Sequence, residues 1–364
     1  MTVVQVTTSN GDPLLLDHPP VGDDCIAALR IQVASALGLH QSQIKLLCGQ
    51  DILADDLTLS ESAAHFLIGE EPLVVTAVVS ELSIEELKKH IDMGRDERPV
   101  GFATMDWIDP DHFGRSYRVP RENWAANRKK LRITFPAPQD ININMLPFMI
   151  GEKASLPEEY HHYWPLVEAC NLPSQEHGKV GYLTIQECFT PKGQSQRRRG
   201  LHIETPGLVM TSDGKYHSHR AMWGCGLLRT GVAVDSDEYP DLPKVEGGIY
   251  MASNTSDSCR LWNALITDPG LVVGQHGDLE HIREVLGKGE VMTPNLMYWL
   301  TDRTPHESLP LQEDAYRQFF RLVTNGLSVW FKEHSTANRL GIKPDPSMTT
   351  IIEGSKFDKP STAA

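Results

Sequence analysis

The stretch Lys179–Thr190, KVGYLTIQECFT, is the longest of a series of strand-like runs that fills the second part of the chain. These runs are rich in β-branched, aromatic and other apolar residues, and Gly, Pro, Asp and Asn separate them. The Asp213–Gly214 pair between two of the runs is typical of a β-hairpin turn. The other runs, all between Leu131 and Val323, are LRITFP, RGLHIET, GLVMTS, KYHSHRAM, GIYMAS, VMTPNLMYWLT and YRQFFRLV.

Helical patterns are fewer than strand-like runs in this part of the chain. We expect helices at LPEEYHHYWPLVEAC, SCRLWNALI, LEHIREVLG and NGLSVWFKEH, mainly at the front and on the periphery of the strands. Spaced strands with peripheral helices predict a sandwich, a jelly roll or a barrel. Such folds enclose a pocket between two sheets, where a ligand or a metal would lie.

The bulk composition limits the possible functions. A chain of 364 residues favours two domains. Its net charge of −14 argues against broad nucleic-acid binding, which needs many Lys and Arg contacts to phosphates. The six cysteines form no C-x-x-C pair, which fits reduced thiols. Neither a secretory signal nor an apolar run of membrane-spanning length is evident, so we expect a cytoplasmic or nuclear protein that binds no membrane.

The first eighty residues have the element pattern of a small separate domain. Val4 and Val6 alternate with polar residues before an Asn10–Gly11 turn, and apolar positions at helical spacing follow between Ile26 and Leu37. The strand IKLLCG, the turn-rich segment DILADDLTLSES and the strand PLVVTAVV complete the module.

This element order, together with QIKLLCGQDILADDLTLSE, resembles the ubiquitin-like β-grasp fold. The resemblance implies a domain over residues 1–81. The following residues, SELSIEELKKH, hold no Gly-Gly end, so conjugation to other proteins is excluded. A docking module for a protein partner is one interpretation, and a domain that only stabilises its neighbour is the other.

Residues 82–130 are expected to connect the two domains and to pack on the larger one. They begin with a helix signal at Ser83 and continue as a turn-rich, charged segment. Trp107, Tyr117 and Trp124 argue against a free linker, because disordered segments are poor in aromatic residues. The large domain then covers residues 131–364.

Polar residues in two of the strand-like runs suggest a metal site. His202 and Glu204 lie two residues apart in RGLHIET, so in a strand both side chains point to one face. His306, after the aromatic run YWLTDRTP, is the best candidate for a third ligand. Arg317 and Arg321 share one face of a later strand, toward the interior if Phe320 faces out, and a buried guanidinium needs a carboxylate partner.

The set His202-x-Glu204, His306 and Arg317 resembles the Fe(II)/2-oxoglutarate-dependent oxygenases, over roughly residues 180–325. The resemblance implies a double-stranded β-helix, Fe(II) bound by the two histidines and Glu204, and 2-oxoglutarate as co-substrate. Arg317 would hold the distal carboxylate of 2-oxoglutarate. Glu204 stands where Asp is commoner, and Phe319 stands where many members carry Ser or Thr, which leaves Arg321 as an alternative anchor.

The fold class predicted for the whole chain is therefore α+β: a small β-grasp domain followed by a mainly-β jelly roll with peripheral helices. The predicted function is a dioxygenase that oxidises a small-molecule or protein substrate. A non-catalytic jelly-roll binding or adaptor protein is the alternative. The chain has no G-x-S-x-G elbow, P-loop or dinucleotide fingerprint.

Other polar residues have simpler interpretations. His217 and His219 are expected on a hairpin arm, Asp278 as a helix cap, and Cys225 as a small buried residue. The run Arg197–Arg199 is expected on a solvated face, with contact to an anionic substrate as the alternative.

Overall fold

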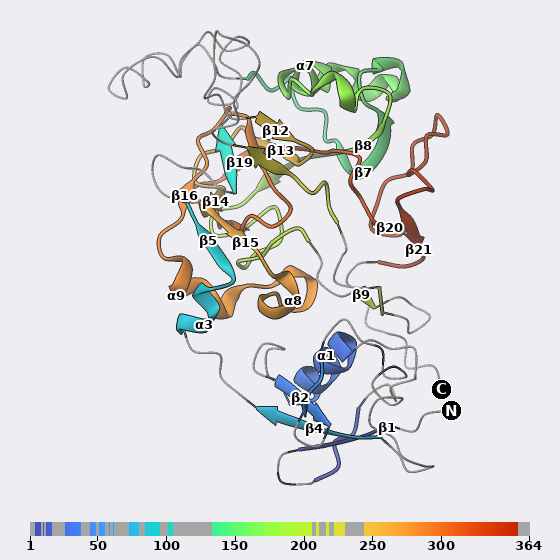
Figure 1. Cartoon of the computed structure of the whole chain (residues 1–364). Coiled ribbons are helices and arrows are strands. Elements are labelled where there is room, and N and C mark those ends of the chain that lie inside the picture. The colour runs from blue at the N-terminus through green and yellow to red at the C-terminus, as the bar shows by residue number, and fades with distance from the viewer. Residues whose placement is uncertain are drawn as a thin grey trace, which may run out of the picture.

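The computed structural model describes most of the large domain and several shorter segments that precede it in the sequence (Figure 1). The described residues are 4–8, 10, 12–16, 26–37, 44–48, 51–54, 58, 61, 73–79, 84–94, 101–104, 133–205, 209–210, 216–217, 222–229 and 244–355.

In the N-terminal part, the described residues include a four-stranded mixed sheet and the helix α1 (Ile26–Leu37). Strands β1 (Val4–Thr8), β2 (Ile44–Cys48), β3 (Asp51–Ile52) and β4 (Leu73–Val79) lie in the order β1-β4-β2-β3. Strand β1 runs parallel to β4, and the other pairs are antiparallel. Helix α1 (Ile26–Leu37) buries Ile26, Leu29 and Val33 in the core of this part, at the helical spacing that the sequence predicts. The resemblance to the ubiquitin-like family stays a prediction.

The described pieces of residues 82–130 pair with strands of the large domain. Helix α3 (Ile84–Lys88) leads into β5 (Ile91–Met93), which pairs with β15 (Ala264–Ile266). Strand β6 (Phe102–Thr104) pairs with β17 (Tyr298–Leu300). The boundaries at residues 81 and 130 stay predictions, and Trp107, Tyr117 and Trp124 lie outside the described residues.

The large domain is built around an antiparallel main sheet. Its six strands lie in the order β6-β17-β13-β19-β8-β7. The central strand β19 pairs with β13 on one side and with β8 on the other. The remaining bounds are β7 (Asn142–Met149), β8 (Val180–Thr190), β13 (Ile249–Ser253) and β19 (Ala315–Val323).

A smaller antiparallel sheet carries β18, the strand that begins at His306. It has the order β16-β14-β18, with β16 (Glu290–Val291), β14 (Cys259–Leu261) and β18 (His306–Ser308). The other described pairs are β9 (Val209–Met210) with β10 (Tyr216–His217), β11 (Leu227–Arg229) with β12 (Lys244–Glu246), and β20 (Val329–Phe331) with β21 (Thr350–Ile352).

Helical segments of the large domain are short. They are α7 (Trp164–Ala169), α8 (Pro269–Val272), α9 (Arg283–Leu286) and the 3-10 turns η4 (Lys153–Ser155), η5 (Glu158–Tyr163), η6 (Ser174–Glu176), η7 (Gln275–Gly277) and η8 (Glu280–Ile282). Most of the described regular structure is β, which is consistent with a jelly-roll-like protein. No helix in the described ranges is long and apolar enough to cross a membrane.

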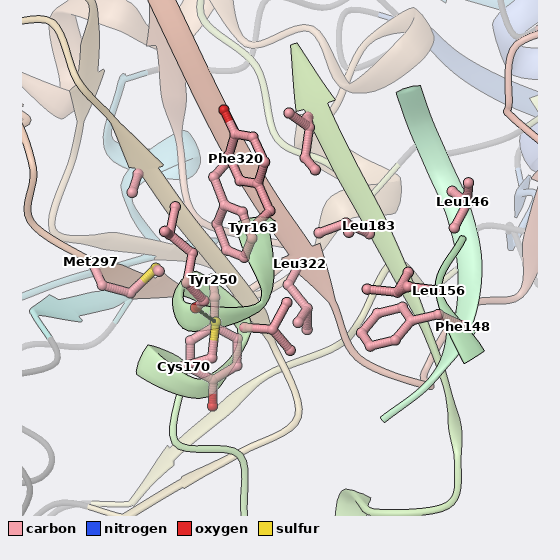
Figure 2. Packing of buried hydrophobic residues seen from close by; sticks show 14 of the residues in the cluster. Leu146, Phe148, Leu156, Tyr163, Cys170, Leu183, Tyr250, Met297, Phe320 and Leu322 are labelled. Carbon is pink, nitrogen blue, oxygen red and sulfur yellow. Dashed lines mark hydrogen bonds between the residues drawn. The ribbon is translucent and has the colours of Figure 1, made fainter. Parts of the chain in front are cut away.

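Each face of the main sheet packs against its own set of buried side chains. One face, shown in Figure 2, places Phe320 and Leu322 among Leu183, Tyr250 and residues of the η5–α7 segment. The opposite face packs Phe319 and Val323 with side chains from the smaller sheet and from β20. Strand β19 is therefore buried on both faces, because successive residues of a strand point to opposite sides.

Four sequence predictions differ from the observed elements. SCRLWNALI forms β14 and β15, and NGLSVWFKEH contains β20, where helices were predicted. Residues 259–261 and 264–266 both alternate buried and partly buried positions, which is the period of a strand. The described part of LRITFP holds no strand, and β7 was not predicted. RGLHIET forms isolated bridges rather than a regular strand.

Candidate active site

His202 and His306 lie side by side although 103 intervening residues separate them in the sequence. The backbone N–H of each donates to the carbonyl of the other, both at 2.9 Å. The two imidazole centroids are 4.5 Å apart. This reciprocal pair fixes the two histidines at the edge of β18, with 8% and 4% of their surfaces exposed.

The hydrogen bonds of the two imidazoles leave the same ring nitrogen available on each. Nδ1 of His202 lies 2.7 Å from the carbonyl of Gly200, and Nδ1 of His306 lies 2.9 Å from the carbonyl of Thr304. A carbonyl only accepts, so Nδ1 carries the proton and Nε2 presents its lone pair. The pKa of His202 is lowered well below its usual value, so this ring is neutral. Burial is the largest cause, and the charges of His306 and Arg198 act in the same direction.

Glu204 is buried beside the histidines and forms an ion pair. Its Oε1 lies 3.7 Å from Nε2 of His306 and accepts a short hydrogen bond from Nη1 of Arg321. Arg321 also approaches Asn144 Oδ1 at 3.3 Å and Thr184 Oγ1 at 3.4 Å. Its Nε is buried without a hydrogen-bond partner in the described structure. Glu204 and Arg321 therefore compensate each other's buried charge.

Arg317 is buried without a carboxylate partner in the described part of the chain. It is 1% exposed and donates to the hydroxyls of Ser253 at 3.2 Å and Ser308 at 3.3 Å. Burial lowers its pKa to about 10. Because neutral hydroxyls compensate a buried cation poorly, Arg317 is suited to bind an anion.

The five residues singled out from the sequence, His202, Glu204, His306, Arg317 and Arg321, line one cavity of about 210 Å³. The sequence did not predict the rest of the lining, except that contact of Arg197 and Arg198 with an anion was an alternative. These other lining residues are Asn144, Gln186, Gln196, Arg197, Arg198, Trp223, Met251, Cys259, Ser308, Phe319 and His334.

The orientation of strand β19 differs in one respect from the prediction. Arg317 and Arg321 do point inward, but Phe320 does not face solvent; it is 0% exposed and packs under the η5–α7 segment (Figure 2). The prediction assumed a sheet with one face exposed to solvent, whereas buried side chains cover both faces of this sheet. Phe319, in the position expected for Ser or Thr, forms part of the cavity wall.

The arginine run divides between the cavity and the surface, so its expected solvated face is only partly right. Arg197 and Arg198 line the cavity, and Arg199 is exposed and bonds to Gly193 and Gln194. Nη1 of Arg198 donates to the carbonyl of His276 at 2.6 Å. The sequence pattern could not distinguish the three arginines, because the run precedes an irregular segment.

The remaining candidates have structural roles or lie outside the description. Asp278 Oδ1 accepts from the backbone N–H of Glu280 at 3.1 Å, whereas the N-cap position of η8 is occupied by Leu279. Burial raises the pKa of the Cys225 thiol to about 11, so it is protonated near neutral pH. The side chain of His217, like all of His219, lies outside the described residues.

Two histidines and a carboxylate are donor types suited to Fe(II). Their chemistry fits such an ion, since both Nε2 atoms are available and Glu204 is adjacent. In the described residues, however, no group of three His, Cys, Asp or Glu side chains is arranged to hold a metal. The Glu204 oxygen that lies 3.7 Å from Nε2 of His306 is the one that pairs with Arg321.

Comparisons with known proteins give little further information. No family model and no curated protein matches the chain. Seven chains of solved structures match, among them one titled "CytC3 with Fe(II) and alpha-ketoglutarate". The two chains are 11% identical, and the match covers 53% of this chain and 78% of that one with a TM-score of 0.21. A similarity this low carries no argument about function, so the cavity residues have to indicate it.

Proposed function

We propose that the large domain is a non-haem Fe(II)/2-oxoglutarate-dependent oxygenase with a double-stranded β-helix core. One observation carries the proposal: the paired histidines His202 and His306, with both Nε2 atoms available, share a cavity with buried Glu204 and with the uncompensated Arg317. A metal triad and an anchor for a dicarboxylate are the two parts that such an enzyme needs.

His202, Glu204 and His306 would hold the iron. The Nδ1 hydrogen bonds of the two histidines support this assignment, because backbone carbonyls fix the tautomer and the orientation of both imidazoles. Glu204 would have to turn from Arg321 toward the histidines. Arg321 would then keep its contacts to Asn144 and Thr184, which offset part of the lost ion pair.

Arg317, rather than Arg321, would hold the distal carboxylate of 2-oxoglutarate. Arg321 already has Glu204 as its partner, whereas Arg317 donates only to two hydroxyls. Ser253 and Ser308 would keep the guanidinium of Arg317 in place for two parallel hydrogen bonds. Bound iron would supply Lewis-acid and redox chemistry, and the walls of Phe319 and Met251 would keep water from the reacting groups.

Anaerobic reconstitution with Fe(II) tests this function. We expect close to one iron per chain and, after addition of O₂, conversion of 2-oxoglutarate to succinate. His202→Ala and His306→Ala should lose most of the iron, while His177→Ala, at an exposed histidine, should bind as much as the parent. If the two cavity variants bind as much iron as the parent, the triad is wrong.

The alternative function is a binding protein without catalysis. The Glu204–Arg321 ion pair favours it, since it leaves no group arranged to hold a metal among the described residues. A parent protein that takes up no iron would support this alternative. In either case, residues 1–81 are proposed as a docking module for a protein partner, as the resemblance to the ubiquitin-like family implies.

A further inference from the structure

The cavity has an excess of positive charge. In its described lining, four arginines, Arg197, Arg198, Arg317 and Arg321, face one carboxylate, that of Glu204, so three positive charges are in excess. The neutral His202 does not change this balance. The whole chain has a net charge of −14, so the cavity charge is opposite in sign to that of the protein.

Two of these four cations are compensated by nearby groups. Arg321 pairs with Glu204. Arg198 donates to the carbonyl of His276. Burial lowers its pKa, and the negative charges of Asp278 and Glu204 offset part of that effect. Since the proposed function assigns Arg317 to 2-oxoglutarate, Arg197 is the cation that the proposal does not use.

Two neutral groups contact the guanidinium of Arg197. Its Nη1 donates to Oε1 of Gln186 at 3.2 Å, and its guanidinium carbon lies 4.9 Å from the centroid of the Phe319 ring. Arg317 approaches the same ring at 5.7 Å. Burial, together with the charges of Arg321 and Arg317, lowers the pKa of Arg197 to about 9, although Glu204 acts in the opposite direction. A cation this close to two others is stabilised by an anion.

Gln196, the residue before Arg197, adds a hydrogen-bond acceptor. Its Nε2 donates to the carbonyls of Gln186 at 3.2 Å and Arg317 at 2.9 Å, which fixes the orientation of the amide. Its Oε1 is buried and has no partner in the described structure, yet Gln196 lines the cavity. A ligand at this place would have to supply an O–H or N–H donor.

We propose that Arg197 and Gln196 form a second anion subsite, and that the substrate is a small anionic molecule whose carboxylate or phosphate binds Arg197 while an O–H or N–H group donates to Gln196. This inference rests on the proposed function, since it takes Arg317 as the site of the co-substrate. It narrows the substrate class to small acids with a donor close to the anionic group.

Binding measurements with four proteins test the two subsites separately: the parent, Arg197→Met, Arg317→Met and Arg199→Met. Isothermal titration would use 2-oxoglutarate, lactate, its neutral amide lactamide, and inorganic phosphate, without iron. Arg199 is exposed and outside the cavity lining, so Arg199→Met controls for the loss of one positive charge.

We expect the parent to bind lactate or phosphate more tightly than lactamide. Arg197→Met should weaken this binding at least about tenfold, because hydrogen bonds to charged groups are worth about 1.5 to 3 kcal/mol. Arg317→Met should bind lactate or phosphate as tightly as the parent does, and so should Arg199→Met. Preference for lactate over phosphate would identify a carboxylate, and the reverse preference a phosphate.

The inference is overturned if lactamide binds as well as both lactate and phosphate, or if Arg197→Met binds both anions like the parent. A failure of the proposed function gives a different result: Arg317→Met would then bind 2-oxoglutarate as well as the parent, whatever Arg197→Met does. If Arg197→Met does not fold, Arg197→Lys replaces it; a compact ammonium cannot form two parallel hydrogen bonds, so weaker anion binding is again expected.

Discussion

The two faces of the main sheet both bury ionisable side chains, but they satisfy them to different degrees. On the face covered by the η5–α7 segment, Glu187 accepts from Tyr163, Gln318 and the backbone N–H groups of residues 139 and 141. On the cavity face, the described residues that accept hydrogen bonds from the Arg317 side chain are two hydroxyls, and they offer no acceptor to the buried Nε of Arg321.

This difference distinguishes a structural network from a binding site. Although burial alone would raise the pKa of Glu187, its four hydrogen bonds lower it by more, so the ionised carboxylate is stable there. Such a network needs no ligand. A buried cation with incomplete partners costs stability unless an anion completes its contacts, which is the condition expected at a site for an acidic ligand.

Removing a large side chain from the covered face should have the largest effect on stability. Phe320→Ala would open a cavity among fully buried neighbours (Figure 2), and we expect a loss of about 3 to 5 kcal/mol in the free energy of unfolding. Urea denaturation measures it. Phe189→Ala is the control on the neighbouring strand, because Phe189 is 60% exposed. Equal losses for the two variants would contradict the assigned packing.

Arg321→Met should destabilise the protein by about 3 kcal/mol, because Glu204 would lose its buried cationic partner. Urea denaturation in the presence of EDTA removes any contribution from metal. The double variant Glu204→Gln/Arg321→Met should recover part of the loss, since it removes both charges. If the double variant loses as much free energy of unfolding as the two single variants lose together, the two residues do not interact.

Buried Asp302 allows a test of how the stability of the protein depends on pH. Burial raises its pKa from 3.8 to about 6, although the backbone N–H of Trp223 donates to it. The folded state therefore binds this proton more tightly than the unfolded chain, and the free energy of unfolding falls as the pH rises from about 4 to about 6.

Asp302→Asn should remove this fall and stabilise the protein at pH 7 by about 2 to 3 kcal/mol. Glu187 acts in the opposite direction: its lowered pKa contributes stability that is lost as the pH falls. Chemical denaturation of parent and variant between pH 4 and pH 7 measures the trend from Asp302. The loss from Glu187 is expected below its ordinary pKa of 4.5, so it requires measurements at lower pH. An unchanged slope between pH 4 and pH 6 in the variant would exclude Asp302 as the source.

Arg317→Met should have the smallest effect on stability, less than about 1 kcal/mol in either direction, because it removes a buried charge without leaving a partner charge behind. The same variant should bind 2-oxoglutarate at least about tenfold more weakly. Denaturation and isothermal titration on the same preparation check both. A loss of stability as large as that of Arg321→Met would mean that Arg317 is structural.

The sequence predicted the mainly-β character and the position of β8 and β19, because long runs of apolar residues between turn residues leave few alternatives. It also selected five residues that the structure brings into one cavity. Their roles as ligands and as co-substrate anchor stay predictions. The helices expected at SCRLWNALI and NGLSVWFKEH were wrong, since short apolar runs do not distinguish a buried strand from a helix.

The surroundings of the site could not be predicted in the same way. The orientation of Phe320 depends on a second layer of residues that covers the sheet, and no local pattern indicates this layer. The inward position of Arg197 depends on Gln186 and Phe319, which lie on two different strands. Contacts between distant segments decide which arginines of a run line the cavity.

The reciprocal hydrogen bonds between His202 and His306 have a consequence for how such a chain can change over evolution. The spacing of the two imidazoles is set by one short backbone bridge and is independent of the length of the chain between them. Insertions in the connections between the strands of residues 206–305 would leave that spacing intact, whereas β13, β14 and β17 in this range belong to the two sheets. A new substrate preference could therefore arise by varying these connections, without rebuilding the pair of histidines.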